Sequence, residues 1–448
     1  MTTPNTARAA GFEAAAALLA ADPTLDGLGP ETHDLLRYLG YADGDRHAAA
    51  GRVRLLRAAA KLRRLFQLPV PDAPGLLFLG GEADPAVMGD HNAGLPMTGL
   101  AGSGLTPSRA FESCVGEGVE YLSQFAQPGD PLGQALVSER LEAHDPHARR
   151  FIAGVLAAAG ADPERPIAWH PVRRPCDGAE AWFPADLCLR RRPDQADFVP
   201  PLKLSTGCAA GVTTEAATLR ALLELIERDA CALWWRGGRR GRVIAPESEA
   251  GQAAATLLAR LRDGQGERRS WLLDITTDLG VPAVAALSAR SDGFGFAFGL
   301  GARLDLAGAA RAAIFELCQV ELSQHVIAAK RREGGEAALN ESDRRQLRRA
   351  TAFDTRTCAL LRPRDTPAAV AAPPDAPASL DALLDRLEGN GITAYTLDLT
   401  RPVFDVPVVR VLAPGLQLEP CEVVGERLAR VIDATGGGAA HTGDIALL

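Results

Sequence analysis

The sequence predicts an α/β (α+β) fold, in which one large domain of two related α/β halves surrounds a common site and follows an N-terminal helical region. Three observations lead to this prediction. Residues 204–235 read as a tight loop followed by a long, apolar helix. Residues 113–121 repeat the two glutamates of that helix at the same spacing. Two strand-like segments, 268–290 and 394–412, also echo each other. A chain of 448 residues is long enough for such a domain and an extra module.

Residues 1–95 are expected to form the N-terminal helical or accessory region. Residues 1 to about 70 read as helices, because alanine-rich and leucine-periodic segments follow one another on a basic background. The basic face is either the solvated side of a helix packed on the core or a docking surface for an acidic peptide or partner protein. The segment PVPDAPG then breaks the chain before LLFLGG, a short strand.

The large domain is expected to span residues 96–448. The stretch 84–104 reads as a loop, in which His91 is a hydrogen-bonded loop histidine rather than a metal ligand. Two segments are expected to lie on the surface: a loop-and-strand insertion at about 125–200, and a Pro- and Ala-rich excursion at about 362–380.

The apolar helix is the element around which the chain is organised. Thr213 or Thr214 can cap it, and about twenty residues of strong helix formers follow. At roughly 100° per residue, one face carries four charged residues: Arg220, Glu224, Glu227 and Arg228. These charges either satisfy one another on a charge-laced helix, or leave two carboxylates facing cations and arginines facing an anion.

A second helix carries the same pair of carboxylates. Glu117 and Glu120 are three residues apart, like Glu224 and Glu227, and Ser113 precedes Glu117 by one helical turn. Pro107 after Thr106 suits the first turn of this helix. A third helix, residues 311–325, contains Arg311, Phe315 and Glu316.

The strands recur as well. Asp274-Ile275-Thr276 and Pro282 match Asp398-Leu399-Thr400 and Pro407, which favours a duplication over a coincidence between two ordinary strand edges. Residues 293–303 alternate Gly and Phe, a pattern more typical of a strand packed closely on a neighbour than of a phosphate loop.

These three helices together resemble the nucleotide-binding signature of the YcaO family, with its patterns S-x3-E-x2-E-R, Q-x3-E-x2-E-R and R-x3-F-E. The resemblance covers roughly residues 100–415. It implies a YcaO-type fold that binds ATP and Mg²⁺. The implied metal ligands are Glu117, Glu120, Glu224, Glu227 and Glu316. The implied ATP or phosphate contacts are Ser113, Arg220, Arg228 and Arg311.

Two positions depart from the family pattern: Tyr121 replaces an arginine, and Arg220 replaces a glutamine. Neither change removes a carboxylate, so metal binding should survive while the hold on phosphates or base changes. The family often has a basic residue where this chain has Ser103. The sequence also ends without the PxPxP tail that azoline-forming members often carry, which indicates either another branch of the family or a shortened sequence.

The resemblance implies ATP-dependent phosphorylation of a backbone amide oxygen in a ribosomally made precursor peptide, followed by nucleophilic attack on the amide carbon. The attack yields an azoline by cyclodehydration or a thioamide, and the sequence does not name the nucleophile or a catalytic residue. The alternative is a catalytically silent nucleotide-binding accessory protein. Implied partners are the precursor peptide and an E1-like leader-binding or TfuA-like protein, and a homodimer stays open.

Charge and cysteine usage exclude other classes. A formal net charge of −8 without a basic stripe argues against a nucleic-acid partner. The eight cysteines form no CxxC pair, so they give no zinc signal and fit a reducing cytoplasm. We find no apolar run of membrane-spanning length and no signal peptide pattern.

Overall fold

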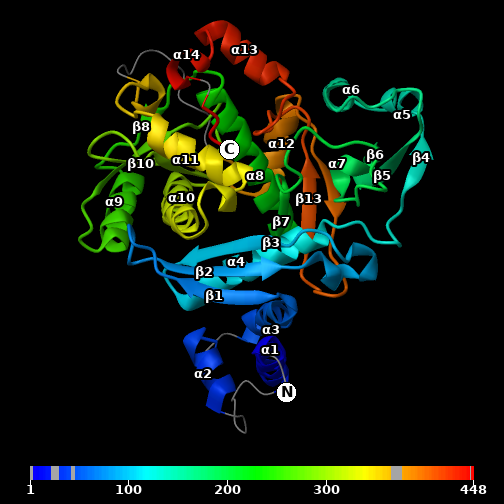
Figure 1. Ribbon diagram of the computed structural model, residues 1–448. Helices are drawn as coiled ribbons and strands as arrows, with labels where there is room; N and C mark the ends of the chain where they lie inside the picture. Colours follow the sequence, from blue (N-terminus) through cyan, green and yellow to red (C-terminus); the bar gives the residue numbers. More distant parts are fainter. Residues whose placement is uncertain (1–3, 22–29, 42–45, 365–375, 444) are drawn as a thin grey trace.

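Three similar sheet–helix units form the body of the protein, and a lobe of helices at the N-terminus extends from them (Figure 1). The computed structural model describes residues 4–21, 30–41, 46–364, 376–443 and 445–448. All strand pairs within its sheets are antiparallel. The predicted mixture of helices and strands in the α/β (α+β) class is confirmed. Within the described residues, no helix is long and apolar enough to cross a membrane.

Each unit is a three-stranded antiparallel arrangement whose third strand leads into a long helix. The first unit consists of β1 (Arg64–Leu68), β2 (Leu77–Ala83), β3 (Thr98–Gly104) and α4 (Pro107–Ser123). The second consists of β12 (Tyr395–Asp398), β13 (Val408–Leu412), β7 (Cys208–Ala210) and α8 (Thr214–Trp235). The third consists of β9 (Arg268–Asp274), β10 (Ala283–Arg290), β11 (Ala297–Ala302) and α10 (Leu306–Gly334).

The three helices begin in the same way. Thr106, Thr213 and Asp305 are the N-cap residues, and each side chain accepts a hydrogen bond from the backbone N–H three residues later. Their backbone angles nearly coincide, with φ between −136° and −134°. Thr213 is therefore the cap of the central helix, and Pro107 occupies the first turn of α4 as expected.

The predicted echo between two strand pairs is confirmed by matching turns. The Oδ1 atoms of Asp274 and Asp398 accept the N–H two residues later, at 2.9 Å and 2.8 Å. The hydroxyl groups of Thr276 and Thr400 accept the N–H that opens the next strand, at 3.0 Å and 3.2 Å. This shared geometry supports related halves, and the structure adds the β1–β2–β3 unit as a third copy of the same arrangement.

Glycines on the third strands allow the helices to approach closely. A Cβ atom on Gly102 would lie 2.2 Å from the backbone nitrogen of Cys114, and one on Gly299 would lie 2.2 Å from the carbonyl oxygen of Ala313. Any larger residue would force α4 or α10 away from its sheet. The predicted strand at 293–303 is thus confirmed as a close-packed one, β11.

The remaining elements extend and cover these units. They are β4 (Gly133–Ala135), α5 (Val137–Leu141), α6 (Pro146–Ala158), β5 (Ile167–Arg173), β6 (Glu180–Pro184), α7 (Ala185–Cys188), β8 (Arg242–Val243), α9 (Glu249–Arg262), α11 (Glu341–Ala352), α12 (Leu380–Gly389), α13 (Glu426–Thr435) and α14 (Ala439–Thr442). Short 3₁₀ turns span Pro85–Met88, Asp90–Asn92, Glu336–Ala338 and Ala359–Leu361.

The N-terminal region is only partly as predicted. Helices α1 (Pro4–Ala21), α2 (Pro30–Tyr38) and α3 (Arg46–Lys61) form the lobe, but the expected helix through residue 68 is wrong, because Arg64–Leu68 is strand β1. Likewise, the expected loop at 84–104 ends in strand β3. Because β1 and β2 pair into one sheet with β3, the sheet crosses the expected boundary at residue 95. We propose that the accessory lobe ends near residue 62.

The expected surface insertion at 125–200 is wrong for its central part. Strand β5 pairs with β12, and Trp169 and Phe183 are completely buried in the core. These large apolar side chains stabilise the sheet from within rather than decorate its surface. Of the expected Pro- and Ala-rich excursion, residues 365–375 lie outside the described residues.

Candidate nucleotide and metal site

Carboxylates from all three units point toward one region between the helices. Glu117 and Glu120 lie on α4, Glu224 and Glu227 on α8, and Glu316 on α10. A spacing of three residues places both members of each pair on one helix face. On α10 the position three residues after Glu316 is Gln319, which completes the same pattern without a charge.

The first carboxylate of each helix is held by its own unit. Glu117 accepts the N–H of Ala101 at 2.6 Å, Glu224 that of Gly207 at 3.1 Å, and Glu316 that of Leu300 at 2.8 Å. In every case the donor precedes the glutamate by 16 or 17 residues. The close strand–helix approach therefore fixes each carboxylate through a backbone donor.

The second side chain of each helix reaches the next unit. Glu120 accepts the N–H of Ala210 on β7 at 2.8 Å, and Glu227 accepts that of Ala302 on β11 at 3.1 Å. Gln319 closes the circle by donating its Nε2 to the hydroxyl of Ser103 on β3 at 2.7 Å. The three units thus form a closed ring of contacts, and five glutamates lie along it, here named the carboxylate ring: Glu117, Glu120, Glu224, Glu227 and Glu316.

Arg228 is the cation closest to this ring. Its guanidinium lies 3.4 Å from both Glu224 and Glu227, and its buried Nη1 has no hydrogen-bond partner. On α8, the charge of Arg228 therefore offsets those of Glu224 and Glu227. This pairing does not extend to Glu117, Glu120 and Glu316, for which no ion pair exists within the described parts of the chain. A guanidinium with an unmet donor beside unpaired carboxylates suits a bound anion together with cations.

Burial shifts the titration of the unpaired carboxyls. Desolvation raises the pKa of Glu117 and Glu316 to about 7 and that of Glu120 to about 8. The neighbouring Glu224 adds to the raised pKa of Glu120, and Glu227 adds to that of Glu316. These mutual effects show that carboxylates from different helices lie within electrostatic reach of one another.

Three exposed arginines lie at the edge of the ring. Arg220 donates its Nη1–H to the carbonyl oxygen of Ala210 at 3.2 Å. Its positive charge partly offsets the rise in the pKa of nearby Glu120. Arg303 was not anticipated from the sequence, although it directly precedes the third helix. Burial lowers the pKa of Arg303, and Arg220 and Arg311 lower it as well, whereas Glu227 raises it. The three arginines therefore lie near one another. Ser113 is also exposed, one turn before Glu117.

Comparison with known proteins shows the family of this chain. The family model described as YcaO cyclodehydratase, ATP- and Mg²⁺-binding, matches residues 101–417. The chain belongs to the YcaO family. Membership confirms the ATP and Mg²⁺ expected from the sequence. A search of curated proteins finds no match.

Solved structures share the YcaO fold. A heterocyclase in complex with substrate and cofactor is 24% identical with a TM-score of 0.63, over 84% of this chain and 52% of that chain. YcaO from Methanopyrus kandleri, bound with AMPPCP and Mg²⁺, is 19% identical with a TM-score of 0.54, over 86% and 91% of the two chains. The E. coli microcin synthetase McbBCD complex with pro-MccB17 bound is 17% identical with a TM-score of 0.56, over 79% and 88%. The chain spans about half the length of the heterocyclase.

The residues of this YcaO chain fit Mg²⁺ bound together with a nucleotide. No three acidic, histidine or cysteine side chains among the described residues are close enough to form a complete metal site by themselves. Mg²⁺ typically takes one or two carboxylates and fills its remaining positions with phosphate oxygens and water. The separated carboxylates of the ring, with arginines at its edge, therefore suit Mg²⁺ that is also bound by phosphate oxygens.

Tyr121 has a packing role in place of the family's arginine. Its ring lies edge-on to Phe125 at 5.2 Å, and the guanidinium of Arg190 stacks over it at 5.0 Å. Its hydroxyl donates to the carbonyl oxygen of Pro96 at 3.5 Å. These contacts account for Tyr121 without any contact to a carboxylate of the ring.

Two cavities lie close to the carboxylate ring. One, of about 680 Å³, is lined by Glu316 and Gln319 together with Lys203, Arg345 and Arg349. Another, of about 660 Å³, shares Lys203 and Arg345 with it. The C-terminal residues lie here, beside α8 and α11 (Figure 1), where Trp235 donates to the carbonyl oxygen of Ile445 at 2.6 Å.

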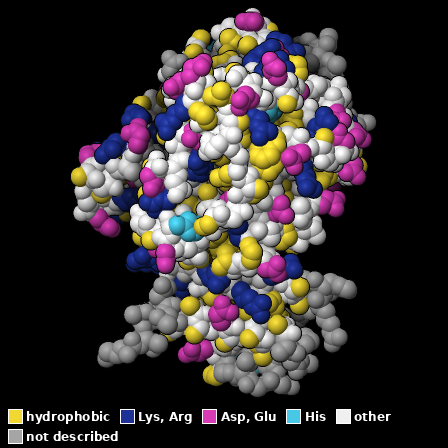
Figure 2. Space-filling view, turned by 90° about the vertical axis from the view of Figure 1, so that its right-hand side faces the viewer, with side chains coloured by type: hydrophobic (Ala, Val, Ile, Leu, Met, Phe, Trp, Pro, Cys, Tyr) yellow, Lys and Arg dark blue, Asp and Glu magenta, His cyan; other side chains and the backbone are white. Residues whose placement is uncertain are grey.

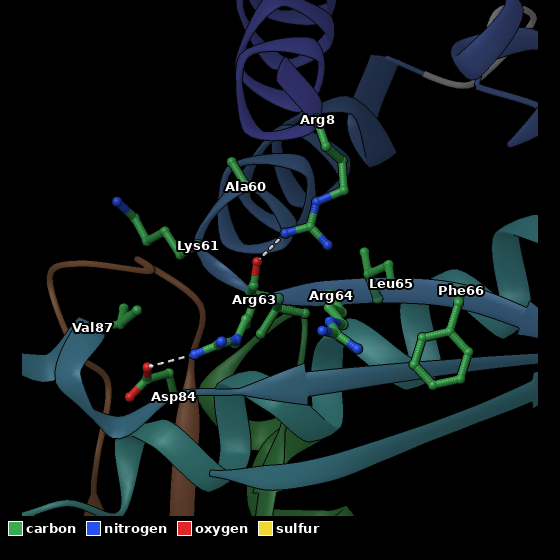
Figure 3. A pocket seen from close by; sticks show the side chains of 10 residues that line it. Arg8, Ala60, Lys61, Arg63, Arg64, Leu65, Phe66, Asp84 and Val87 are labelled. Carbon is green, nitrogen blue, oxygen red and sulfur yellow. Dashed lines mark hydrogen bonds and ion pairs between the residues drawn. The ribbon is translucent and has the colours of Figure 1, made fainter. Parts of the chain in front are cut away.

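A further cavity, of about 800 Å³, lies away from the ring, between the N-terminal lobe and β1 (Figure 3). Arg8 bonds to the carbonyl oxygen of Leu62 at the end of α3, and Arg63 reaches Asp84 at 3.9 Å. Arg8 thus ties α1 to the end of α3, and Arg63 reaches the residue that follows strand β2. On the face shown in Figure 2, acidic and basic side chains are interspersed over the body above this lobe. Docking of an acidic peptide at the lobe stays a prediction.

Other predicted features are confirmed. His91 lies 3.3 Å from the carbonyl oxygen of Ala126 and 3.0 Å from the amide of Asn92, which suits a hydrogen-bonded loop residue. Cys114, Cys231 and Cys318 are buried in the three ring helices as small apolar side chains.

The raised pKa values predict an unusual pH dependence. Without Mg²⁺, the thermal midpoint should fall by a few degrees as the pH rises from about 5 to about 8. The folded state holds protons on Glu117, Glu120 and Glu316 that the unfolded chain releases near pH 4.5, so rising pH favours the unfolded state. Mg-ATP should reduce this dependence, because it binds the ionised carboxylates. Thermal unfolding at several pH values checks both statements, and Glu120→Gln should weaken the Mg-free trend. A midpoint that rises across this range would contradict the prediction.

Proposed function

We propose that this chain modifies backbone amides of a ribosomally synthesised precursor peptide in an ATP- and Mg²⁺-dependent reaction. The main observation in support is the carboxylate ring, in which three units each fix acidic side chains through backbone donors. Such preorganised groups suit phosphoryl transfer, where catalysis consists of positioning and charge stabilisation. The structurally similar E. coli microcin synthetase McbBCD complex, which has pro-MccB17 bound, supports a peptide substrate and protein partners.

Each group in the site has a specific task in this proposal. Glu117, Glu120, Glu224, Glu227 and Glu316 hold Mg²⁺, and Ser113, Arg220, Arg228, Arg303 and Arg311 contact the nucleotide. When bound, Mg²⁺ neutralises the phosphate charge of ATP. An amide oxygen is a poor leaving group, whereas the same oxygen leaves readily as phosphate. The cavity beside Glu316 opens a route by which a peptide amide can reach the phosphate.

The product is either an azoline or a thioamide. A Cys, Ser or Thr side chain of the peptide attacks the amide carbon in the first case, and an external sulfide attacks it in the second. Mass spectrometry of a candidate precursor separates them, since loss of one water indicates cyclodehydration and exchange of oxygen for sulfur indicates thioamidation. An unmodified precursor in the presence of Mg-ATP and the protein partners would reject the enzyme.

A catalytically silent accessory protein is the second candidate, favoured by the departures at Tyr121 and Arg220. All five carboxylates of the ring are nevertheless present, and Tyr121 is explained by packing. A silent protein would bind Mg-ATP without hydrolysing it when peptide and partners are added. A genomic neighbourhood with a short precursor gene and an E1-like or TfuA-like gene would support the enzyme.

Mg-ATP is expected to stabilise the folded chain. A ligand that binds only the folded state adds about 2.7 kcal/mol at one hundred times its Kd. Thermal-shift measurements with ATP, with Mg²⁺ and with both should show the largest increase for the pair. Mg-ADP is a useful comparison because it lacks the terminal phosphate. If ATP caused no Mg²⁺-dependent shift, the nucleotide-binding role of all three helices would be rejected.

A further inference from the structure

A cluster of three cations beside the carboxylate ring has no acidic side-chain partner. The cationic cluster consists of Lys203, in the loop before β7, and Arg345 and Arg349, one turn apart on α11. No Asp or Glu carboxylate lies within ion-pair distance of these residues in the described chain. Isolated charges of one sign repel one another, so such a cluster favours an anion.

Arg349 is the clearest case. It is only 5% exposed, and its buried Nε atom has no hydrogen-bond partner. Its Nη1 donates to the carbonyl oxygen of Leu447, and its guanidinium lies 4.7 Å from the centre of the Phe298 ring. A carbonyl oxygen and an aromatic ring carry no net charge, so they only partly offset the cost of burying a guanidinium. Burial, with a smaller contribution from the neighbouring Arg345, lowers the pKa of Arg349 to about 10.

The cluster lies where the two cavities meet. Lys203 and Arg345 line both, and Arg349 lines the one that also contains Glu316. The pKa of Lys203 is lowered by burial and then by Arg228, which itself pairs with Glu224 and Glu227. The cluster is therefore a direct neighbour of the carboxylate ring.

Most other charges of these cavities are already paired. Lys330 contacts Asp343 at 3.1 Å, and Arg236 contacts Glu419 at 2.9 Å. Glu316 and Glu422 line the same walls without an ion pair in the described chain. The three cations of the cluster outnumber these two carboxylates.

We propose that Lys203, Arg345 and Arg349 bind a phosphate group, either the terminal phosphate of ATP or inorganic phosphate. A phosphate with two negative charges matches three cations better than a single carboxylate does. Its oxygens also suit the forked donors of arginine and the point charge of lysine. The position beside Glu316 places this site next to the proposed nucleotide, so its biological role rests on the proposed function.

Calorimetric titration of inorganic phosphate into the full chain, without Mg²⁺ or nucleotide, tests the cluster directly. Wild type should bind phosphate, and Lys203→Gln and Arg345→Gln should each weaken binding by about tenfold or more, since each loses a charge-assisted contact of about 1.5–3 kcal/mol. Arg348→Gln is the matched control, because Arg348 is exposed on the same helix and pairs with Glu341 at 3.4 Å. Arg349 is left unchanged, as its burial couples it to folding.

Two further titrations identify the source of the phosphate. Competition by Mg-ATP but not by Mg-ADP would assign the cluster to the terminal phosphate, whereas phosphate binding undisturbed by either would assign it to free phosphate. N-acetylglutamate is the carboxylate probe, and binding as tight as that of phosphate would overturn the proposal. Absence of phosphate binding to wild type, or equal binding by the two glutamine variants, would overturn it as well. These readouts need no peptide modification, so a failure here is distinct from a failure of the proposed function.

Discussion

Replacing Glu224 or Glu227 with glutamine is expected to lower ATP turnover by at least about 100-fold, while the protein stays folded and equally or more stable. The glutamine carbonyl can still accept the N–H of Gly207 or Ala302, so the strand–helix frame persists. Only the negative charge needed for the metal is lost. Arg228 keeps the other carboxylate of the pair, and repulsion between neighbouring carboxylates is relieved.

Steady-state ATP hydrolysis, together with circular dichroism and thermal unfolding, measures both parts of this prediction. Glu215→Gln is the matched control, because Glu215 lies in the exposed first turn of the same helix. It should leave turnover unchanged. Unfolding of both site variants would instead show that the pair stabilises α8 through Arg228, which is the charge-laced interpretation of this helix.

The three ring helices could be predicted because their signals are local. Capping residues, helical periodicity and glutamates three residues apart all lie within one segment, so they fix which side chains share a face. The matching Asp–Thr turns were also readable, since each turn is closed by its own side chains. Hydrogen bonds of this kind join residues that are close in the sequence, so their pattern can be recognised from the sequence alone.

Elements that depend on distant partners could not be predicted. Strand β1 is short and apolar, and periodicity alone does not separate such a run from the end of a helix. Strand β5 joins the sheet of the second unit by pairing with β12, more than two hundred residues later. The same reason hid the β1–β2–β3 unit, whose Ser103 accepts the closing contact from Gln319.

The cations around the site show the same limit. Arg303 lies in the loop before α10, and Lys203 lies in the loop before β7. Arg345 lies on α11, which carries none of the family's motifs. No spacing rule connects these positions in a single sequence. The segment around Arg345 has the composition of a solvated, charged helix, and a surface helix and a helix lining a cavity can have the same composition.

Arg220→Gln is expected to weaken ATP binding by one to two orders of magnitude, the loss of a charge-assisted contact of about 1.5–3 kcal/mol. The competing possibility is that Arg220 pairs with a carboxylate and blocks a metal position, in which case the variant would bind metal and ATP better. The geometry favours the first. Arg220 is exposed, its Nη1 donates to the carbonyl oxygen of Ala210, and it forms no ion pair with a carboxylate of the described chain.

Binding isotherms for Arg220→Gln with and without Mg²⁺ decide between the two possibilities. Arg260→Gln, on the exposed side of α9, is the control for loss of one surface arginine and should bind ATP like wild type. Arg220→Lys should recover part of the affinity, because lysine keeps the charge but not the forked donors. The N–H of Ala210 binds Glu120 while its carbonyl oxygen binds Arg220, so the backbone of one residue links both side chains. Tighter ATP binding by the glutamine variant would therefore mean that Arg220 restrains Glu120, and the phosphate-binding role would be rejected.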